Sequence, residues 1–204
     1  MVEISLYFHI PFCTKKCPYC HFYVIPDKTS HKDLLGEALS LEWEEKLPLL
    51  LGKRIVSIYF GGGTPTLYAP EGIKAILDQI YNSGLSIAKD CEITIEANPE
   101  DSGKGLFQKL RSLGINRMSL GVQSLDDRSL LSLERGHEAK KAKEAIQEAH
   151  SAGFDNLSID LMYDLPSQTE ASWQYTLSRL SSLPIQHLLF CHQADHRTLS
   201  SHPR

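Results

Sequence analysis

"FCTKKCPYCHF", residues 12–22, places Cys13, Cys17 and Cys20 at a C-x3-C-x2-C spacing. Structural zinc takes four ligands, usually from two separated pairs, and the other two cysteines, Cys91 and Cys191, stand alone. Three thiolates can instead hold three irons of a [4Fe–4S] cluster, because soft sulfur ligands favour iron–sulfur chemistry. The spacing therefore predicts a cluster whose fourth iron is open to another ligand. A zinc-bound or unligated loop is the alternative.

The composition indicates the compartment and excludes some partners. The chain has 204 residues, 42% of them hydrophobic, and a formal net charge of −4, so we expect no nucleic-acid partner. The N-terminal MVEISLYFHI lacks a basic region and a cleavage site, and no apolar run reaches the roughly 18 residues of a transmembrane segment. An odd number of crowded cysteines is typical of a reducing compartment, so the sequence predicts a cytoplasmic protein.

A strand–helix alternation extends through the chain. β-branched apolar runs predict strands at residues 4–10, 55–60, 91–97, 117–122, 157–163 and 187–190. Apolar residues at helical spacing predict helices near 31–47, 73–80, 106–113, 142–149 and 173–180. This order predicts an α/β fold with right-handed crossovers and a parallel sheet. We expect a partial (β/α)6 barrel. A flat, doubly wound sheet is the alternative, and periodicity does not separate the two.

Polar residues follow the predicted strands in a regular way. The first strand leads into the cysteine loop, the second ends in GGGTPT (61–66), and Glu96, Gln123 and Asp160 belong to the next three. Ligands of parallel α/β folds bind at the carboxyl ends of the strands, so these groups predict one shared site. Singly, each has a plainer interpretation. The glycines could form a tight turn, the polar residues could be caps or solvated, and Arg135 and His137 could lie on the surface.

Aromatic residues surround the three cysteines. Phe12, Tyr19, Phe22 and Tyr23 flank the loop. We expect all four to screen a bound cluster from water and to tune its potential.

These stretches together resemble a known family. "YFHIPFCTKKCPYCHF", "FGGGTPT", "IEANPE", "GVQS" and "IDLMYDLP" are similar to the radical S-adenosylmethionine (SAM) proteins. Within them the resemblance is to the oxygen-independent coproporphyrinogen III oxidases and the haem chaperone HemW. It implies a partial barrel of the radical SAM type, with Cys13, Cys17 and Cys20 holding a [4Fe–4S] cluster. The methionyl amine and carboxylate of SAM would chelate the open iron, and reduction of the cluster would yield a 5′-deoxyadenosyl radical.

The resemblance also implies roles for residues near the methionyl end of SAM. Tyr7 matches a tyrosine that lies against the cluster and cofactor, and Glu96 matches a carboxylate that pairs with the ammonium group. Gly62, Gly63 and Thr64 match a loop whose backbone meets the methionyl group.

Three further positions complete the implied cofactor site. Arg135 matches a guanidinium that grips the cofactor carboxylate. Gln123 and Asp160 match the partners of the ribose hydroxyls.

One position and one segment separate the branches of the family. The oxidases carry an additional cysteine two residues after the third, where this chain has Phe22, and a long segment before the first cysteine. Both differences favour HemW, which implies haem binding and transfer to haem proteins. Oxidative decarboxylation of coproporphyrinogen III, an oxidoreductase reaction, is the alternative. The implied partners are haem or a porphyrinogen, an electron donor and a haem-acceptor protein. Asp164 stands where the family has glycine in "YGLP", so a positive φ is expected there.

The C-terminal segment departs from the family. After Leu188 the chain reads LFCHQADHRTLSSHPR, without an apolar period or a sixth helix. We expect a radical SAM core domain at 1–190, truncated relative to the family, and an atypical, disordered tail at 191–204. A metal site formed by Cys191, His192 and His196 is an alternative for this segment.

Overall fold

The computed structural model describes residues 1–165 and 168–192, and these residues contain one six-stranded parallel sheet. All six predicted strands are confirmed, with ends that differ by a few residues. The observed strands are β1 (Glu3–Ile10), β4 (Arg54–Gly62), β5 (Ser86–Ala97), β6 (Arg117–Gln123), β7 (Leu157–Tyr163) and β8 (His187–His192).

The strand order decides between the two predicted architectures. The sheet runs β1-β4-β5-β6-β7-β8 with every neighbouring pair parallel. A doubly wound sheet reverses its order part-way, whereas this sheet follows the chain without reversal. Right-handed crossovers in one direction place the helices on one side, and twist curves the sheet into part of a barrel. The partial (β/α)6 barrel is confirmed.

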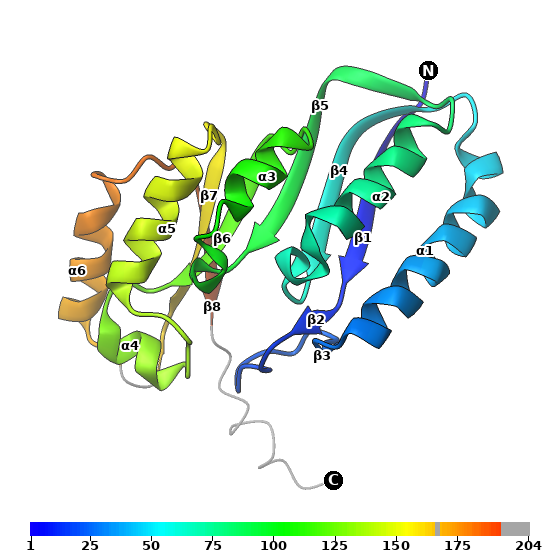
Figure 1. Ribbon diagram of the computed structural model, residues 1–204. Coiled ribbons are helices and arrows are strands. Elements are labelled where there is room, and N and C mark those ends of the chain that lie inside the picture. The colour runs from blue at the N-terminus through cyan, green and yellow to red at the C-terminus, as the bar shows by residue number, and fades with distance from the viewer. Residues whose placement is uncertain (166–167, 193–204) are drawn as a thin grey trace, which may run out of the picture.

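Helices cover the outer face of this sheet (Figure 1). The five predicted helices are confirmed, whereas a short helix, α4, and two 3-10 turns, η1 and η2, were not predicted. The predicted five are α1 (Thr29–Leu50), α2 (Ala69–Tyr81), α3 (Leu106–Ser112), α5 (Ala139–Ser151) and α6 (Glu170–Leu180). The additional elements are α4 (Asp127–Ser132), η1 (Pro65–Tyr68) and η2 (Pro99–Asp101).

The hydrophobic core lies between the helices and the outer face of the sheet. Alternate strand residues such as Phe60, Ile95 and Leu120 are fully buried there. The apolar stripes of α2 and α5 pack onto them. The stripe of α5 consists mainly of alanines, whose small side chains allow the helix backbone to approach the strands closely.

The opposite, concave face of the sheet is polar. Tyr59, Glu96, Ser119 and Asp160 occupy the alternate positions of four neighbouring strands and are linked in pairs by hydrogen bonds. Parallel sheets usually bury apolar side chains on both faces. A polar concave face is therefore the side on which a ligand is expected.

The cysteine loop follows β1 and is closed by a small parallel pair, β2 (Phe12–Cys13) and β3 (Ile25–Pro26). The amide of Ile25 donates to the carbonyl of Pro11 at 2.8 Å, and the amide of Asp27 donates to the carbonyl of Cys13 at 3.1 Å. The two ends of the loop are thus held together below the end of β1 (Figure 1).

The final strand is longer than predicted. Cys191 and His192 belong to β8, so the expected tail does not begin at residue 191. The rest of that predicted tail, residues 193–204, lies outside the described residues, as does His196 of the alternative metal site. Asp164 adopts a φ of +62°, which confirms the expected left-handed conformation at this position. Among the described residues, no helix is long and apolar enough to cross a membrane.

Edge strand β8 exposes apolar side chains. Leu188, Leu189 and Phe190 are 42%, 53% and 46% exposed, and in the described part of the chain β8 pairs on one side only. Unpaired, apolar strand edges promote association. We therefore expect the 204-residue chain to self-associate as its concentration rises, measured by gel filtration over about a 20-fold range.

The test variant is Leu188→Lys, since a lysine on an edge strand opposes pairing. It should shift the population towards monomer. Leu131→Lys, at a residue of α4 that is 78% exposed, is the matched control and should leave association unchanged. A monomeric wild-type chain at all concentrations would show that β8 does not mediate contacts.

Candidate functional site

One cavity of about 920 Å³ lies at the carboxyl ends of the strands, beneath the cysteine loop. It gathers all three predicted metal ligands, Cys13, Cys17 and Cys20. It also gathers seven of the eight residues predicted for the cofactor: Gly62, Gly63, Thr64, Glu96, Gln123, Arg135 and Asp160. Residues more than 140 positions apart in the sequence therefore share one site, as the strand ends predicted.

The eighth residue, Tyr7, lies beside the cavity and does not line it. Its ring stacks on Tyr59 at a centroid distance of 5.9 Å, and its hydroxyl lies 3.1 Å from Nδ1 of His9. Burial and the nearby charge of Glu96 raise the pKa of Tyr7. The tyrosine is thus a neutral group at the margin of the site.

The three thiols are free and half-buried. Burial raises the pKa of Cys13, as do the charges of Cys20 and Cys17, while a 3.7 Å contact with the Thr64 hydroxyl opposes the rise. The thiols are therefore close enough to influence one another. Among the described residues, no three His, Cys, Asp or Glu side chains converge as ligands of a single metal ion. A cluster does not need such convergence, because each cysteine binds a different iron.

Arg135 joins the cysteine loop to the strand ends. Its Nη1 lies 3.7 Å from Sγ of Cys17 and 3.3 Å from the Tyr19 hydroxyl. Its Nη2 donates to Oδ1 of Asn98 at 2.7 Å and to the carbonyl of Gly121 at 3.1 Å. The side chain is only 8% exposed, so the interpretation of Arg135 as a surface residue is wrong.

Glu100 lies between Arg135 and His137, with its side chain about one-third exposed. Oε2 of Glu100 lies 3.6 Å from Nη2 of Arg135 and 3.2 Å from Nδ1 of His137. Burial alone would raise the pKa of Glu100, but the close contact with His137 and the charge of Arg135 outweigh it and lower the pKa to about 2. Glu100 is thus ionised at neutral pH. The His137 side chain is fully buried, so a surface role is wrong for this residue too.

Glu96 is fixed by two donors. The Tyr59 hydroxyl donates to its Oε1 at 2.8 Å, and the amide of Gly62 donates to its Oε2 at 3.0 Å. A carboxylate has about four acceptor positions, so the group can accept further bonds from a ligand in the cavity. The sequence did not predict Tyr59, Asn98 or Glu100 as site residues. Asn98 and Glu100 do belong to the quoted motif "IEANPE".

Gln123 is the last residue of β6, and Asp160 lies in the middle of β7. Oδ1 of Asp160 accepts a hydrogen bond from Ser119 at 3.0 Å. Burial, only partly offset by that bond and reinforced by the charge of Glu96, raises the pKa of Asp160 to about 6. Gln123 adopts a φ of +65°, which is uncommon for a residue other than glycine. Backbone strain of this kind concentrates at functional sites.

The glycine loop after β4 packs directly against the cysteine loop. A Cβ atom on Gly63 would come within 2.5 Å of the carbonyl oxygen of Phe12, and one on Gly62 within 2.7 Å of the His9 ring. The amide of Thr64 donates to the same Phe12 carbonyl at 2.7 Å. Gly63 is therefore required to seat the cysteine loop, and Gly62 is required for the close approach of β1. The sequence did not predict either role.

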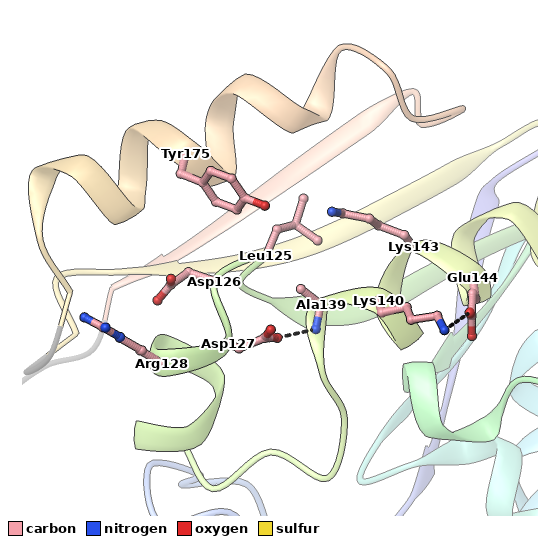
Figure 2. Close-up of a pocket in the computed structure, with 9 residues that line it drawn as sticks. All are labelled: Leu125, Asp126, Asp127, Arg128, Ala139, Lys140, Lys143, Glu144 and Tyr175. Atoms are coloured by element: carbon pink, nitrogen blue, oxygen red, sulfur yellow. Dashed lines mark hydrogen bonds and ion pairs between the residues drawn. The ribbon is translucent and has the colours of Figure 1, made fainter.

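A second cavity, of about 630 Å³, lies on the outside of the barrel between α4, α5 and α6 (Figure 2). Its three carboxylates are occupied by groups of the protein itself. Asp126 caps α4, Asp127 accepts from the amide of Ala139, and Glu144 lies 3.8 Å from Lys140. This cavity contains neither cysteines nor strand ends, and we do not assign the functional site to it.

A known protein family matches most of this chain. The model of the radical SAM superfamily matches residues 7–180. The chain belongs to the radical SAM superfamily. Within it, the relatives place the chain in the group of HemW and the oxidase HemN.

Three relatives illustrate this similarity. Heme chaperone HemW of Escherichia coli (strain K12) is 36% identical over 168 residues, covering 81% of this chain and 44% of that protein. Radical S-adenosyl methionine domain-containing protein 1, mitochondrial, of Danio rerio is 39% identical, covering 88% and 40%. The solved structure of E. coli coproporphyrinogen III oxidase HemN has a TM-score of 0.84 at 30% identity, covering 97% and 45%. The chain thus spans less than half the length of these relatives.

The raised pKa of Asp160 predicts a pH-dependent stability. Because the pKa is about 6 in the folded protein and 3.8 normally, the folded state binds more protons between these values. Stability of the cofactor-free protein should therefore fall as pH rises from about 4 to 6. Asp160→Asn should remove this loss and raise the free energy of unfolding at pH 7 by about 1–3 kcal/mol.

Urea unfolding of the wild type and of Asp160→Asn at about pH 4.5 and 7 measures the effect. Asp155→Asn is the control, because the Asp155 side chain is 92% exposed. Equal stabilities of wild type and Asp160→Asn at pH 7 would contradict a desolvated Asp160 carboxylate.

Proposed function

We propose that this chain is the core of a HemW-like radical SAM protein that binds a [4Fe–4S] cluster and SAM and takes part in haem binding and transfer. The observation that carries the proposal is the single cavity in which three free thiols face the polar strand ends. Soft sulfur donors suit an iron–sulfur cluster, and the guanidinium of Arg135 beside Cys17 would offset its negative charge.

In this proposal, Cys13, Cys17 and Cys20 hold the cluster. When bound, the cluster and SAM supply one-electron radical chemistry. The residues of the chain bind and orient the cluster and SAM, and they exclude water from the site. Glu96 offers its free acceptor positions to the methionyl ammonium group. Asp160, with Gln123, offers acceptors to the ribose hydroxyls.

The resemblance implied that the guanidinium of Arg135 grips the cofactor carboxylate, and the contacts of its nitrogens favour one of them for this role. Both of its terminal nitrogens already contact protein atoms. Its buried Nε has no hydrogen-bond partner in the described part of the chain, and buried donors of this kind require one. We therefore assign the cofactor carboxylate to Nε, with the positive charge acting over a short distance.

The haem-related role rests on the relatives and on one position. The E. coli protein at 36% identity is named as a heme chaperone, and Phe22 replaces the additional cysteine of the oxidases. The alternative, coproporphyrinogen III oxidation, is supported by the TM-score of 0.84 with HemN. An electron donor stays a predicted partner under both functions, and a haem-acceptor protein stays a predicted partner under the chaperone function. A cytoplasmic location stays a prediction, since a relative from Danio rerio is named as mitochondrial.

The two functions are separated by anaerobic incubation of the reconstituted protein with SAM and a reductant. With haem, the chaperone proposal predicts a stoichiometric shift of the Soret band and transfer to an apo-haem protein. With coproporphyrinogen III, it predicts no vinyl product. Turnover to the vinyl product would assign the oxidase function instead.

The cluster assignment makes a separate prediction. Anaerobic reconstitution should give about four irons per chain, and replacement of Cys13, Cys17 or Cys20 by Ala should abolish stable incorporation. Cys91→Ala is the matched control, because Cys91 is buried in β5 and acts as a small apolar residue. An intact cluster in Cys17→Ala, measured by iron content and absorption, would contradict the assignment.

Gln123 provides a test of the SAM site. Gln123→Asn shortens the side chain and still tolerates the positive φ at this position, so the backbone should be retained. SAM affinity should fall by about 10-fold if a buried hydroxyl loses its partner, while iron content is unchanged. Calorimetry on the reconstituted protein measures this, with Gln147→Ala on the exposed side of α5 as the control. Equal SAM affinity of the wild type and Gln123→Asn would remove β6 from the cofactor site.

A further inference from the structure

Phe22 does not screen the cysteines as the sequence suggested. Its side chain is 68% exposed, and that of Tyr23 is 72% exposed, whereas Phe12 is fully buried. Phe22 nevertheless lines the same cavity as the three thiols. A large apolar side chain that is both exposed and part of a cavity wall lies at the mouth of that cavity. Exposed apolar groups that gather at a cavity mouth are typical of ligand-binding sites.

Positive charge lies beside this aromatic residue. Lys15 and Lys16 line the cavity and are exposed, and residues 14–26 contain no carboxylate. Lys15 pairs with Glu134, and both side chains of this pair are more than half exposed. Such a pair is weak, so Lys15 can exchange its partner for a ligand carboxylate. Lys16 makes no ion pair with any of the described residues.

Strand β8 contributes a second exposed apolar side chain to the cavity wall. Leu189 of β8 lines the cavity, is 53% exposed, and stands next to Asp160 in the register of the sheet. The mouth therefore combines apolar groups from two separate elements with amines from the cysteine loop. We name this set the lip and define it as Lys15, Lys16, Phe22 and Leu189.

We propose that the lip binds the face and the propionate edge of a tetrapyrrole, so that the macrocycle lies across the mouth of the cluster cavity. This inference rests on the proposed function and adds the place and the chemistry of binding. Phe22 and Leu189 would cover the apolar ring, and the lysines would pair with the propionates. A tetrapyrrole fits this set because it joins a flat apolar surface to carboxylates at one edge.

The same site explains why Phe22 suits a chaperone. A thiol at this position would add a further soft ligand next to the cluster, whereas a phenyl ring adds only contact area for an aromatic ligand. A protein partner is the competing occupant of the lip. The two are distinguished by a small ligand, since a porphyrin tests the lip without any protein surface.

The experiment uses the reconstituted protein, in which the cluster occupies the three thiols. Metal-free protoporphyrin IX is the first probe, because it needs no axial ligand and its binding is measured by fluorescence. Its dimethyl ester, which retains the ring and lacks the carboxylates, is the second. Both are titrated into the wild type, Phe22→Ala and the double variant Lys15→Gln/Lys16→Gln.

Matched controls lie elsewhere on the surface. Leu131→Ala removes an apolar side chain that is 78% exposed on α4. Lys104→Gln/Lys109→Gln removes two exposed amines near α3. SAM titration of every variant checks that the cofactor site is intact.

We expect Phe22→Ala to weaken both probes by about 5- to 10-fold, because both present the same ring. The double lysine variant should weaken the diacid by about 10-fold and leave the ester unchanged, because only the diacid carries charge. The controls should bind as the wild type does.

Two results would overturn the proposal in different ways. If the wild type binds protoporphyrin and the lip variants bind it equally well, the lip is not the tetrapyrrole site, while the haem-related function stands. If the reconstituted wild type binds neither protoporphyrin nor haem, the haem-related function fails and the lip proposal fails with it.

Discussion

The site depends on a buried guanidinium at the junction of the cysteine loop and the sheet. Arg135 contacts Cys17 of the cysteine loop, and it also contacts Asn98 and Gly121 near the strand ends. The carboxylate of Glu100, 3.6 Å away, compensates its charge. A buried charge is tolerated only when it is paired and hydrogen-bonded. The loop and the strand ends must therefore keep this relative position, because movement of either would leave the guanidinium unpaired. The thiols are thereby held against the polar face.

Much of the fold follows from the sequence alone, because strand and helix periodicity is a local signal. The stripe of α2 and the apolar strand runs identify these elements directly. Strand order is not a local signal. It depends on which strand each crossover connection places next to the preceding one, and no single segment determines this. The choice between a partial barrel and a doubly wound sheet therefore required the structure. The short helix α4 was missed because its six residues are fewer than two helical turns.

The site was predictable where it depends on strand ends and less so where it depends on side-chain packing. Glu96, Gln123 and Asp160 were found because parallel strands bring their carboxyl ends to one edge. The burial of Arg135 and His137 was not found, because a loop residue gives no periodic signal. Exposure of Phe22 was likewise unforeseen, since aromatic residues near cysteines suggest shielding. The cysteine loop thus presents the side chain of Phe22 to solvent.

The central claim is that three thiolates hold a four-iron cluster with one iron open to SAM. Mössbauer spectroscopy of the 57Fe-reconstituted protein, with and without SAM, tests this most directly. The account predicts a [4Fe–4S] cluster in which one iron site changes its isomer shift when SAM binds, while three thiolate-bound irons stay unchanged. A single mononuclear iron site, or a cluster whose four irons do not respond to SAM, would contradict it.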